Sequence, residues 1–160
     1  MFKKRGASLA LAMTALVAII AAGEPAKAQT VGRPMSNSGP TIDVYPTCNY
    51  SRTTAALSGG QVIVPSVQST GSITCVLGYG NSGRAVKRLQ MSLNACYYAL
   101  YFVIDAPLVE DGVYGSLTRE AVMDVQRHVG LGADGVYGPQ TRDAMLHEGA
   151  TLLPPCNWVA

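Results

Sequence analysis

The sequence has few residues that could serve metal or acid–base chemistry. It contains two histidines, His128 and His147, and neither belongs to a His-Glu-x-x-His motif of zinc peptidases. No Gly-x-Ser-x-Gly elbow is present, and Glu110, Asp111 and Asp134 are better explained as turn residues than as a glycosidase pair. We therefore predict no catalytic residue, no bound metal and no cofactor.

The N-terminus has the three regions of a secretory signal peptide. A basic patch at residues 3–5 precedes an apolar run from Leu9 to Ala22, and the small residues Ala26-Lys27-Ala28 form a cleavage site. The alternative is a membrane anchor, but the apolar run is short for a span of ~20 residues. We predict a signal peptide over residues 1–28, so the mature chain has no membrane segment.

Charge of either sign is scarce. Charged residues make up 14% of the chain and hydrophobic residues 48%, which is typical of a folded protein. The net charge is +2, but cleavage removes four basic residues and one acidic residue and leaves about −1. A near-neutral mature chain offers no electrostatic basis for binding nucleic acid or an anionic membrane.

Four cysteines follow the leader, and no two of them form a Cys-x-x-Cys pair, which argues against a zinc site. In a short exported chain they indicate two disulfides. Three pairings are possible, and the sequence does not decide between them. We prefer the pairing that closes the N-terminal segment on itself and ties the chain end to the helices: Cys48–Cys75 and Cys96–Cys156.

Between the leader and residue 77 the chain is rich in turn formers and short β-prone runs. Residues 29–47 combine glycine, proline and small polar residues, and we predict a flexible lead-in. Within residues 48–77, Gln61–Val64 and Ser72–Val76 are β-prone and Ser58-Gly59-Gly60 is a turn signal. This disulfide-bounded segment is predicted to be irregular or to contain a β-hairpin.

A Gly-rich stretch leads into the first helical pattern. Gly78–Gly83 lacks the context of a phosphate-binding loop, so we expect a loop with Ser82 as the helix N-cap. From Arg84 to Ala95 one face carries apolar residues at helical spacing: Val86, Leu89 and Leu93. The other side is basic and is either a solvated face or a contact for carboxylates or phosphates: Arg84, Lys87 and Arg88.

An internal duplication is the most specific pattern in the sequence. Asp111–Gly115 recurs unchanged as Asp134–Gly138, and the residues that follow each copy also match. The helical patterns before the turns match as well, with Gln90 and Gln126 at equivalent places. Such a match is hard to reach by chance. The repeating unit is a helix, an Asp-Gly-Val-Tyr-Gly turn and a second helix, and the middle helix serves both copies.

Each turn is expected to start a helix. Asp-Gly is a strong turn dipeptide, because glycine adopts positive φ without a Cβ clash. The second helix is predicted from about Leu117 to Val129, with Gly130 ending it. The third is predicted from about Pro139, which suits a first helical position, to His147.

These motifs together resemble the peptidoglycan-binding domain 1 family, from about Gly80 to Leu146. The resemblance implies a mainly-α fold, a three-helix bundle over residues 78–149 with a duplicated helix–DGVYG–helix unit and a tail at 150–160. The short disulfide-linked segment precedes it. Two features depart from the family pattern: about a dozen extra residues between Leu93 and Asp111, and Val125 where the family often has phenylalanine.

The resemblance implies a non-catalytic module that binds peptidoglycan. Such modules are commonly attached to wall hydrolases, but residues 29–79 are too few for a hydrolase and contain no histidine. We predict a secreted, cell-wall-associated peptidoglycan-binding protein, with a secreted hydrolase as a possible further partner. The alternatives are a secreted protein-interaction or regulatory module on the same scaffold, and a small wall hydrolase.

Sugars and stem peptides require aromatic faces and a few fixed polar donors. The candidate ligand-binding residues are Tyr97, Tyr98, Tyr101, Tyr114, Tyr137, Arg84, Arg119 and Arg142. For the tyrosines of the two turns, the competing expectation is a buried ring with its hydroxyl tip outward. For Arg119 and Arg142 it is plain solvent exposure.

Overall fold

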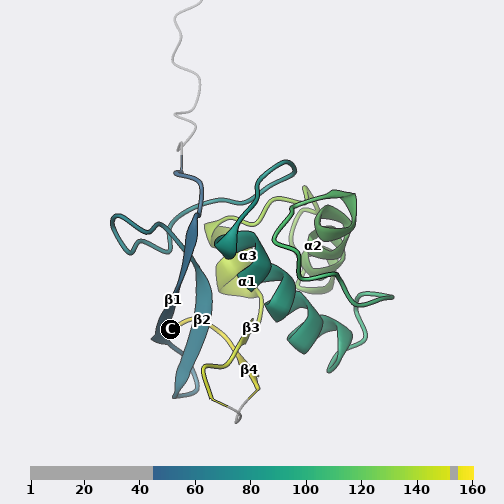
Figure 1. The fold of residues 1–160 in the computed structure, drawn as a ribbon. Helices are drawn as coiled ribbons and strands as arrows, with labels where there is room; N and C mark the ends of the chain where they lie inside the picture. The colour runs from purple at the N-terminus through teal and green to yellow at the C-terminus, as the bar shows by residue number, and fades with distance from the viewer. Residues whose placement is uncertain (1–44, 152–154) are drawn as a thin grey trace, which may run out of the picture. The chain divides into compact units, whose positions relative to one another are not determined.

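The computed structural model describes residues 45–151 and 155–160, so the predicted signal peptide and nearly all of the predicted lead-in lie outside the described residues. The elements follow in the order β1 (Tyr50–Ala55), β2 (Gln61–Ser66), α1 (Arg84–Ser92), a π-helical segment (Leu93–Tyr98), α2 (Ser116–His128), α3 (Pro139–Ala144), β3 (His147–Glu148) and β4 (Cys156–Asn157) (Figure 1). No helix in the described ranges is long and apolar enough to cross a bilayer.

A β-hairpin opens the described part of the chain. Strands β1 and β2 pair antiparallel, with Tyr50 opposite Ser66 and Ala55 opposite Gln61. Gln61–Val64 is therefore in a strand as expected, but its partner is β1 and not the β-prone run at 72–76. The outer face of β1 stays exposed, so this strand carries polar residues and escapes a search for apolar runs.

Helix α1 begins at Arg84 after Gly83, with no side-chain cap, so the prediction of Ser82 as N-cap is wrong. The apolar face predicted from the spacing is confirmed, because Val86, Leu89 and Leu93 are fully buried. These three residues belong to the same core cluster as Val122 and Val125 of α2. Helix α1 also contacts the hairpin and β3, and it continues into the π-helical segment (Figure 1).

The two duplicated turns start α2 and α3 as predicted. Gly115 and Gly138 stand at the two N-caps, and Pro139 occupies the first turn of α3. Gly130 ends α2 at φ 78°, where Leu131 N–H donates to the Gln126 carbonyl at 2.8 Å. Helix α3 is shorter than predicted, because the chain becomes extended at Met145 and then forms β3.

The prediction of a mainly-α three-helix bundle is wrong. The described chain combines short helices with two small antiparallel sheets, β1–β2 and β3–β4. Helix α3 has 6 residues, too few to bury a core face against two other helices. The hairpin and the β3–β4 pair supply the missing cover, mainly over α1.

Two disulfides join the outer segments to the core. Cys48 bonds Cys75, and Cys96 bonds Cys156, which is the pairing preferred above. Three of these four cysteines are buried within one hydrophobic cluster that also contains the core faces of α1 and α2. We call the residues between Leu93 and Asp111 that depart from the family pattern the insert; the second disulfide fixes the chain end beside the start of this insert.

Candidate functional site

The first duplicated turn is held by one buried glutamine. Gln90 Nε2 lies 2.9 Å from Asp111 Oδ1, 3.1 Å from the Val113 carbonyl oxygen and 3.2 Å from Thr118 Oγ1. Its Oε1 accepts a hydrogen bond from Gly112 N–H at 2.8 Å. The hydrogen bond from Gln90 is the main reason that the pKa of Asp111 lies below its ordinary value.

The second turn is held in the same way by Gln126. Its Nε2 lies 2.7 Å from Asp134 Oδ1, 3.1 Å from the Val136 carbonyl oxygen and 3.0 Å from Thr141 Oγ1. Its Oε1 accepts from Gly135 N–H at 2.9 Å. The repeated glutamine found in the sequence is thus the side chain that satisfies the buried polar groups of each turn.

The tyrosines of the two turns are core residues. Tyr114 and Tyr137 are both 0% exposed, as expected for their rings, but the prediction of outward hydroxyl tips is wrong. Tyr114 Oη donates to the Gly135 carbonyl at 3.0 Å and so links the two turns. Burial raises the pKa of both phenols. Neither ring presents a face to a ligand.

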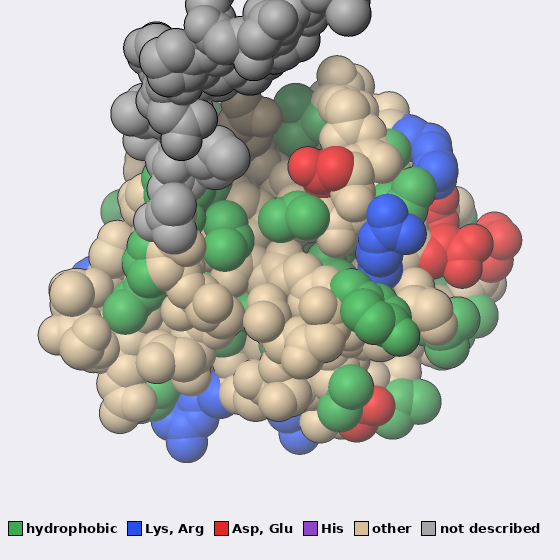
Figure 2. Space-filling view, turned by 90° about the horizontal axis from the view of Figure 1, so that it is seen from above, with side chains coloured by type: hydrophobic (Ala, Val, Ile, Leu, Met, Phe, Trp, Pro, Cys, Tyr) green, Lys and Arg blue, Asp and Glu red, His purple; other side chains and the backbone are tan. Residues whose placement is uncertain are grey.

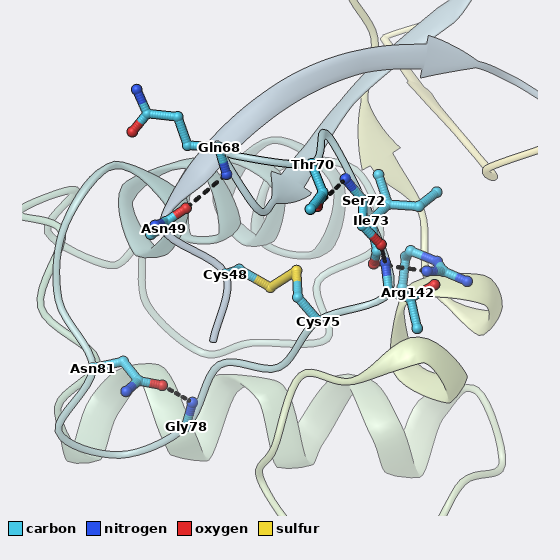
Figure 3. The surroundings of a disulfide bond; sticks show 11 residues. Cys48, Asn49, Gln68, Thr70, Ser72, Ile73, Cys75, Gly78, Asn81 and Arg142 are labelled. Carbon is cyan, nitrogen blue, oxygen red and sulfur yellow. Dashed lines mark hydrogen bonds between the residues drawn. A yellow bond between two sulfur atoms is a disulfide. The ribbon is translucent and has the colours of Figure 1, made fainter. Parts of the chain in front are cut away.

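Residues 77–83 form a strap that pairs with both turns. Leu77 exchanges backbone hydrogen bonds with Tyr137 at 2.8 and 2.9 Å, and the Asn81 carbonyl accepts from Tyr114 N–H at 2.9 Å. Asn81 also closes the strap on itself by accepting from Gly78 N–H at 2.8 Å (Figure 3). The strap joins the two turns into a single platform.

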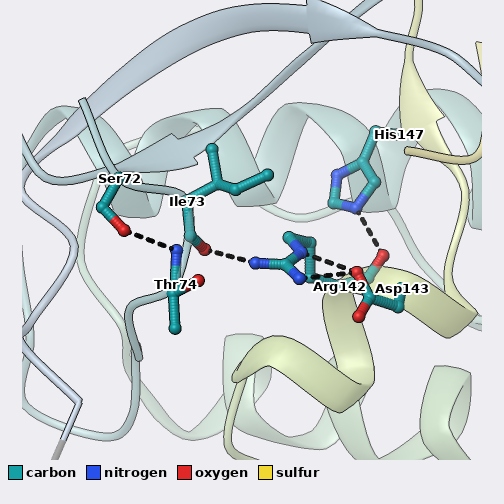
Figure 4. Close-up of polar contacts among 6 residues, drawn as sticks. All are labelled: Ser72, Ile73, Thr74, Arg142, Asp143 and His147. Atoms are coloured by element: carbon teal, nitrogen blue, oxygen red, sulfur yellow. Dashed lines mark hydrogen bonds and ion pairs between the residues drawn. The ribbon is translucent and has the colours of Figure 1, made fainter. Parts of the chain in front are cut away.

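We call the side of each copy that carries its equivalent arginine, Arg119 or Arg142, the flank of that copy. The flank of the second copy is covered by another segment of the chain. Arg142 is 9% exposed, donates to the Ile73 carbonyl at 2.7 Å and pairs with Asp143 at 2.7 Å (Figure 4). Ile73 belongs to the loop that the Cys48–Cys75 disulfide closes, so Arg142 connects this loop to α3 (Figure 3). Arg142 was predicted either to contact ligand or to lie in solvent, and the structure uses it to join two segments.

His147 lies next to the contact between Arg142 and Ile73. It is fully buried, and its Nε2 is 3.0 Å from the Arg142 carbonyl oxygen (Figure 4). Burial, with smaller contributions from the nearby arginines, lowers its pKa from 6.5 to about 4. The neutral imidazole is therefore a structural part of the second copy.

The corresponding flank of the first copy is open. Arg119, equivalent to Arg142, is exposed, and its one hydrogen bond runs to the Asp134 carbonyl at 3.3 Å. It lies in a groove of about 500 Å³ lined by Tyr79, Ser116, Arg119, Glu120, Met123 and Arg127. Figure 2 shows acidic and basic side chains next to one another on the right of the molecule, the side on which Figure 1 places α2. We call this hollow the α2 groove.

A second hollow lies between the insert, the end of α2 and the chain end. The rings of Tyr97, Tyr101 and His128 lie with each pair of centroids 6.3 Å apart. They line a pocket of about 230 Å³ together with Val129, Ala144, Leu146 and Trp158. We call it the aromatic pocket.

Two of these ring residues were predicted from the sequence, and the other two were not. Tyr97 and Tyr101 line the aromatic pocket, whereas Tyr98, also proposed, does not. His128 and Trp158 were missed, because they come from segments distant in the sequence. The available signal was that Trp158, the single tryptophan, lies two residues after a cysteine expected to bond Cys96.

The basic residues of α1 have separate roles. The Arg84 guanidinium lies 4.8 Å from the centre of the Tyr50 ring, a cation–π contact with the hairpin. Arg88 is buried and pairs with Glu148, so the expectation of a solvated face is wrong for it. Lys87 is exposed.

No group of three or more His, Cys, Asp or Glu side chains is placed to hold a metal ion in the part of the chain that the structure describes. The α2 groove is lined by two guanidinium groups, one carboxylate, one phenol, one hydroxyl and the thioether of Met123. Such a set can bind carboxylates and amines by charge and hydrogen bonding.

Comparison with known proteins agrees with the duplicated motif. A protein family described as "Putative peptidoglycan binding domain" matches residues 82–145, which contain both turns. No curated protein matches the chain.

Three solved structures are similar over part of the chain. The endolysin of Burkholderia AP3 phage is 42% identical over 41% of this chain and 22% of its own, with a TM-score of 0.35. A peptidoglycan-binding protein from Clostridioides difficile, in complex with glutamine hydroxamate, is 34% identical over 52% and 43%, with a TM-score of 0.39. The SleB N-terminal domain is 33% identical over 43% and 85%, with a TM-score of 0.36. The chain thus spans less than half of the length of the first two.

Proposed function

Because residues 82–145 belong to the peptidoglycan-binding domain family, we propose that the chain is an exported, non-catalytic protein that binds the bacterial cell wall. The observation that carries the proposal is the coincidence of the family match with the duplicated, glutamine-locked turns. The two turns and their strap form a rigid platform, and the first copy leaves its flank open to a ligand.

Export is supported by the cysteines as well as by the leader. All four cysteines of the sequence are paired, and the two disulfides close loops of 27 and 60 residues. Disulfides persist in oxidising compartments and are rare in the cytosol. The same bonds fix the N-terminal loop and the chain end on the platform, so the fold depends on them.

The α2 groove is the surface that we propose for the wall peptide. Stem peptides carry carboxylates and amines, and Arg119, Glu120 and Arg127 of α2 all line the groove. Arg127 also pairs with Asp124 at 2.6 Å, which leaves Arg119 as the less constrained guanidinium. Guanidinium groups bind carboxylates in a bidentate manner. A glycosidase needs two carboxyl groups across the scissile bond, whereas Glu120 is the one carboxylate that lines this groove, which favours binding over cleavage.

Sedimentation with insoluble sacculi tests the proposal. The oxidised mature chain is expected to sediment with sacculi at moderate salt, and zymography is expected to show no clearing. Protein that stays in the supernatant would contradict wall binding, and clearing would contradict a non-catalytic role.

Charge reversal tests whether sacculi are bound by the α2 groove or by other parts of the surface. Arg119→Glu combined with Arg127→Glu should release the protein from sacculi at lower salt. The matched control is Lys87→Glu, which makes the same type of change at an exposed position outside the groove. If the control variant weakens retention by sacculi as much per reversed charge as the groove variant does, the protein binds sacculi through its overall charge and not through the α2 groove.

A further inference from the structure

We propose that the aromatic pocket binds one uncharged sugar ring of the glycan strand. This inference rests on the proposed function, but it concerns a different surface from the α2 groove and a different part of the wall polymer. Four aromatic side chains from three separate segments line the pocket: Tyr97, Tyr101, His128 and Trp158.

The exposed rings offer faces that a sugar can stack against. Trp158 is 43% exposed and Tyr101 is 51% exposed, whereas Tyr97 is 2% exposed and forms the floor. Trp158 lines the pocket and is largely accessible to solvent, so its indole can contact a ligand there. The C–H bonds of a pyranose face pack well on the electron-rich face of such a ring.

The charge of the lining selects against the peptide part of the wall. Among residues 45–151 and 155–160, no Lys, Arg, Asp or Glu lines the aromatic pocket, whereas Arg119, Glu120 and Arg127 line the α2 groove. A charged ligand would lose hydration in the pocket without gaining an ionic partner. An uncharged ligand with hydroxyl and amide groups suits the rings and the polar edges of His128 and Tyr101.

The size of the pocket limits the ligand to about one ring. Its volume is about 230 Å³, below the ~300–1,000 Å³ of pockets that enclose drug-sized molecules. The pocket is partly open to solvent, so the neighbouring sugars of a strand can continue outside it. A single aromatic subsite of this kind can therefore sit on a long polymer.

The walls of the pocket are fixed in advance of binding. The Cys96–Cys156 disulfide joins the residue before Tyr97 to the residue two before Trp158. Tyr97 Oη accepts from Leu146 N–H at 2.6 Å, and the Trp158 carbonyl accepts from Leu57 N–H at 2.9 Å. A site that is rigid before binding loses less entropy when the ligand arrives.

The insert turns back sharply beside the pocket. Phe102 has φ 53°, the one positive φ among the described non-glycine residues, and Val103 N–H then donates to the Tyr97 carbonyl at 2.7 Å. This turn returns the chain next to Tyr97 and leaves Tyr101 on the pocket wall. The insert that departs from the family pattern thus supplies two of the four rings.

The single tryptophan makes the test direct. The oxidised mature chain is titrated with the N-acetylglucosamine tetramer, which has no stem peptide, while Trp158 fluorescence is followed. A saturable change in emission is expected. Tyr101→Ala should raise the dissociation constant about 10-fold, equivalent to about 1.4 kcal/mol.

Tyr98→Ala is the matched control, because it removes the same side chain from the same insert outside the pocket. It should leave the titration unchanged. Circular dichroism and thermal melting confirm that each variant is folded. Equal weakening by Tyr98→Ala and Tyr101→Ala would overturn the assignment to the pocket.

The outcomes separate this inference from the proposed function. If the chain sediments with sacculi but the tetramer leaves Trp158 emission unchanged, the sugar proposal is wrong and wall binding stands. If emission instead changes with protein concentration alone, a second copy of the chain occupies the pocket and the proposal is also wrong. If sacculi do not retain the chain, the proposed function itself fails.

Discussion

Arg119 and Arg142 occupy the same position in the two copies of the duplicated unit, yet Arg119 is exposed and Arg142 is almost fully buried. The turns before them are locked by the same hydrogen bonds from Gln90 and Gln126, to similar lengths. The copies therefore share an interior and differ in what covers them. Duplication provides two equivalent flanks, and the disulfide-closed loop at Ile73 closes one of them.

A second pair of positions separated by the repeat offset, Asp124 and His147, also differs in burial. His147 lies in β3 of the covered second copy and is fully buried, whereas Asp124, 23 residues earlier, lies in α2 and pairs with Arg127 near the surface at 2.6 Å. The covered flank holds structural side chains, and the open flank leaves Arg119 accessible to solvent. Four predictions test this difference.

The largest effect is expected where the copies are alike. Gln90→Leu and Gln126→Leu each leave several buried polar groups of a turn without a partner, at ~1–3 kcal/mol per group. Each should lower the free energy of unfolding by about 4 kcal/mol. Denaturant unfolding measures it, with the exposed Gln140→Leu as control. Very different losses in the two copies would contradict their equivalence.

A pH effect is expected in the second copy alone. The pKa of His147 is about 4 in the folded chain and 6.5 ordinarily, so the unfolded chain binds the proton first. His147 therefore gives full stability above pH 6.5, and this contribution falls as the pH drops towards 4, by up to about 3 kcal/mol.

His147→Gln should flatten the dependence of unfolding free energy on pH over this interval. His128→Gln, at an exposed position, should leave the dependence unchanged. An identical slope in wild type and His147→Gln would show that other groups cause the acid sensitivity.

Alanine substitutions at the two turn glycines should destabilise the protein to different extents, because the atoms near the added Cβ differ. Gly112 and Gly135 have φ 74° and 70°, so alanine strains both. A Cβ at Gly112 would lie 2.9 Å from the backbone oxygen of Gly83, whereas at Gly135 it would meet the side chains of Arg119 and Met123.

We expect Gly112→Ala to cost about 2 kcal/mol of unfolding free energy, and Gly135→Ala about 1 kcal/mol, because the exposed Arg119 can rotate away. Thermal melting compares them. Gly135→Ala should also weaken sacculus retention, since it displaces Arg119. Unchanged retention at a reduced melting temperature would separate Arg119 from wall binding.

Substitutions of the equivalent arginines should have small effects on stability, and these effects should differ between Arg119 and Arg142. Arg142→Ala removes a charge-assisted bond to the Ile73 carbonyl and should cost about 1.5 kcal/mol without direct effect on sacculus retention. Arg119→Ala should change stability by less than about 0.5 kcal/mol but reduce retention. The reverse assignment, with Arg142 needed for binding, would show that the covered flank opens in solution.

Much of the local structure could be predicted from the sequence. The core face of α1, the starts of α2 and α3 and the end of α2 at Gly130 all follow from periodicity, glycine conformation and proline geometry. The hydrogen bonds involved lie within a few residues of one another or within one repeated unit. The preferred pairing of the cysteines, which closes the N-terminal segment on itself and ties the chain end to the helices, is present.

The errors concern contacts between distant segments. Strand β1, the short α3, the buried Arg88 and the hydroxyl tips of Tyr114 and Tyr137 all depend on what packs against them. The aromatic pocket needs residues of the insert, α2 and the chain end, and its Trp158 was missed. The periodicity and composition of one segment do not show which of its side chains another segment will bury.

The sequence by itself determined the repeated unit, because a glycine-containing turn and the glutamine that locks it are encoded within each copy. Only the tertiary structure decided that the two copies differ, because the loop that buries Arg142 comes from the other end of the described chain. Burial depends on which segments meet, and the same arginine is therefore structural in one copy and available to a ligand in the other.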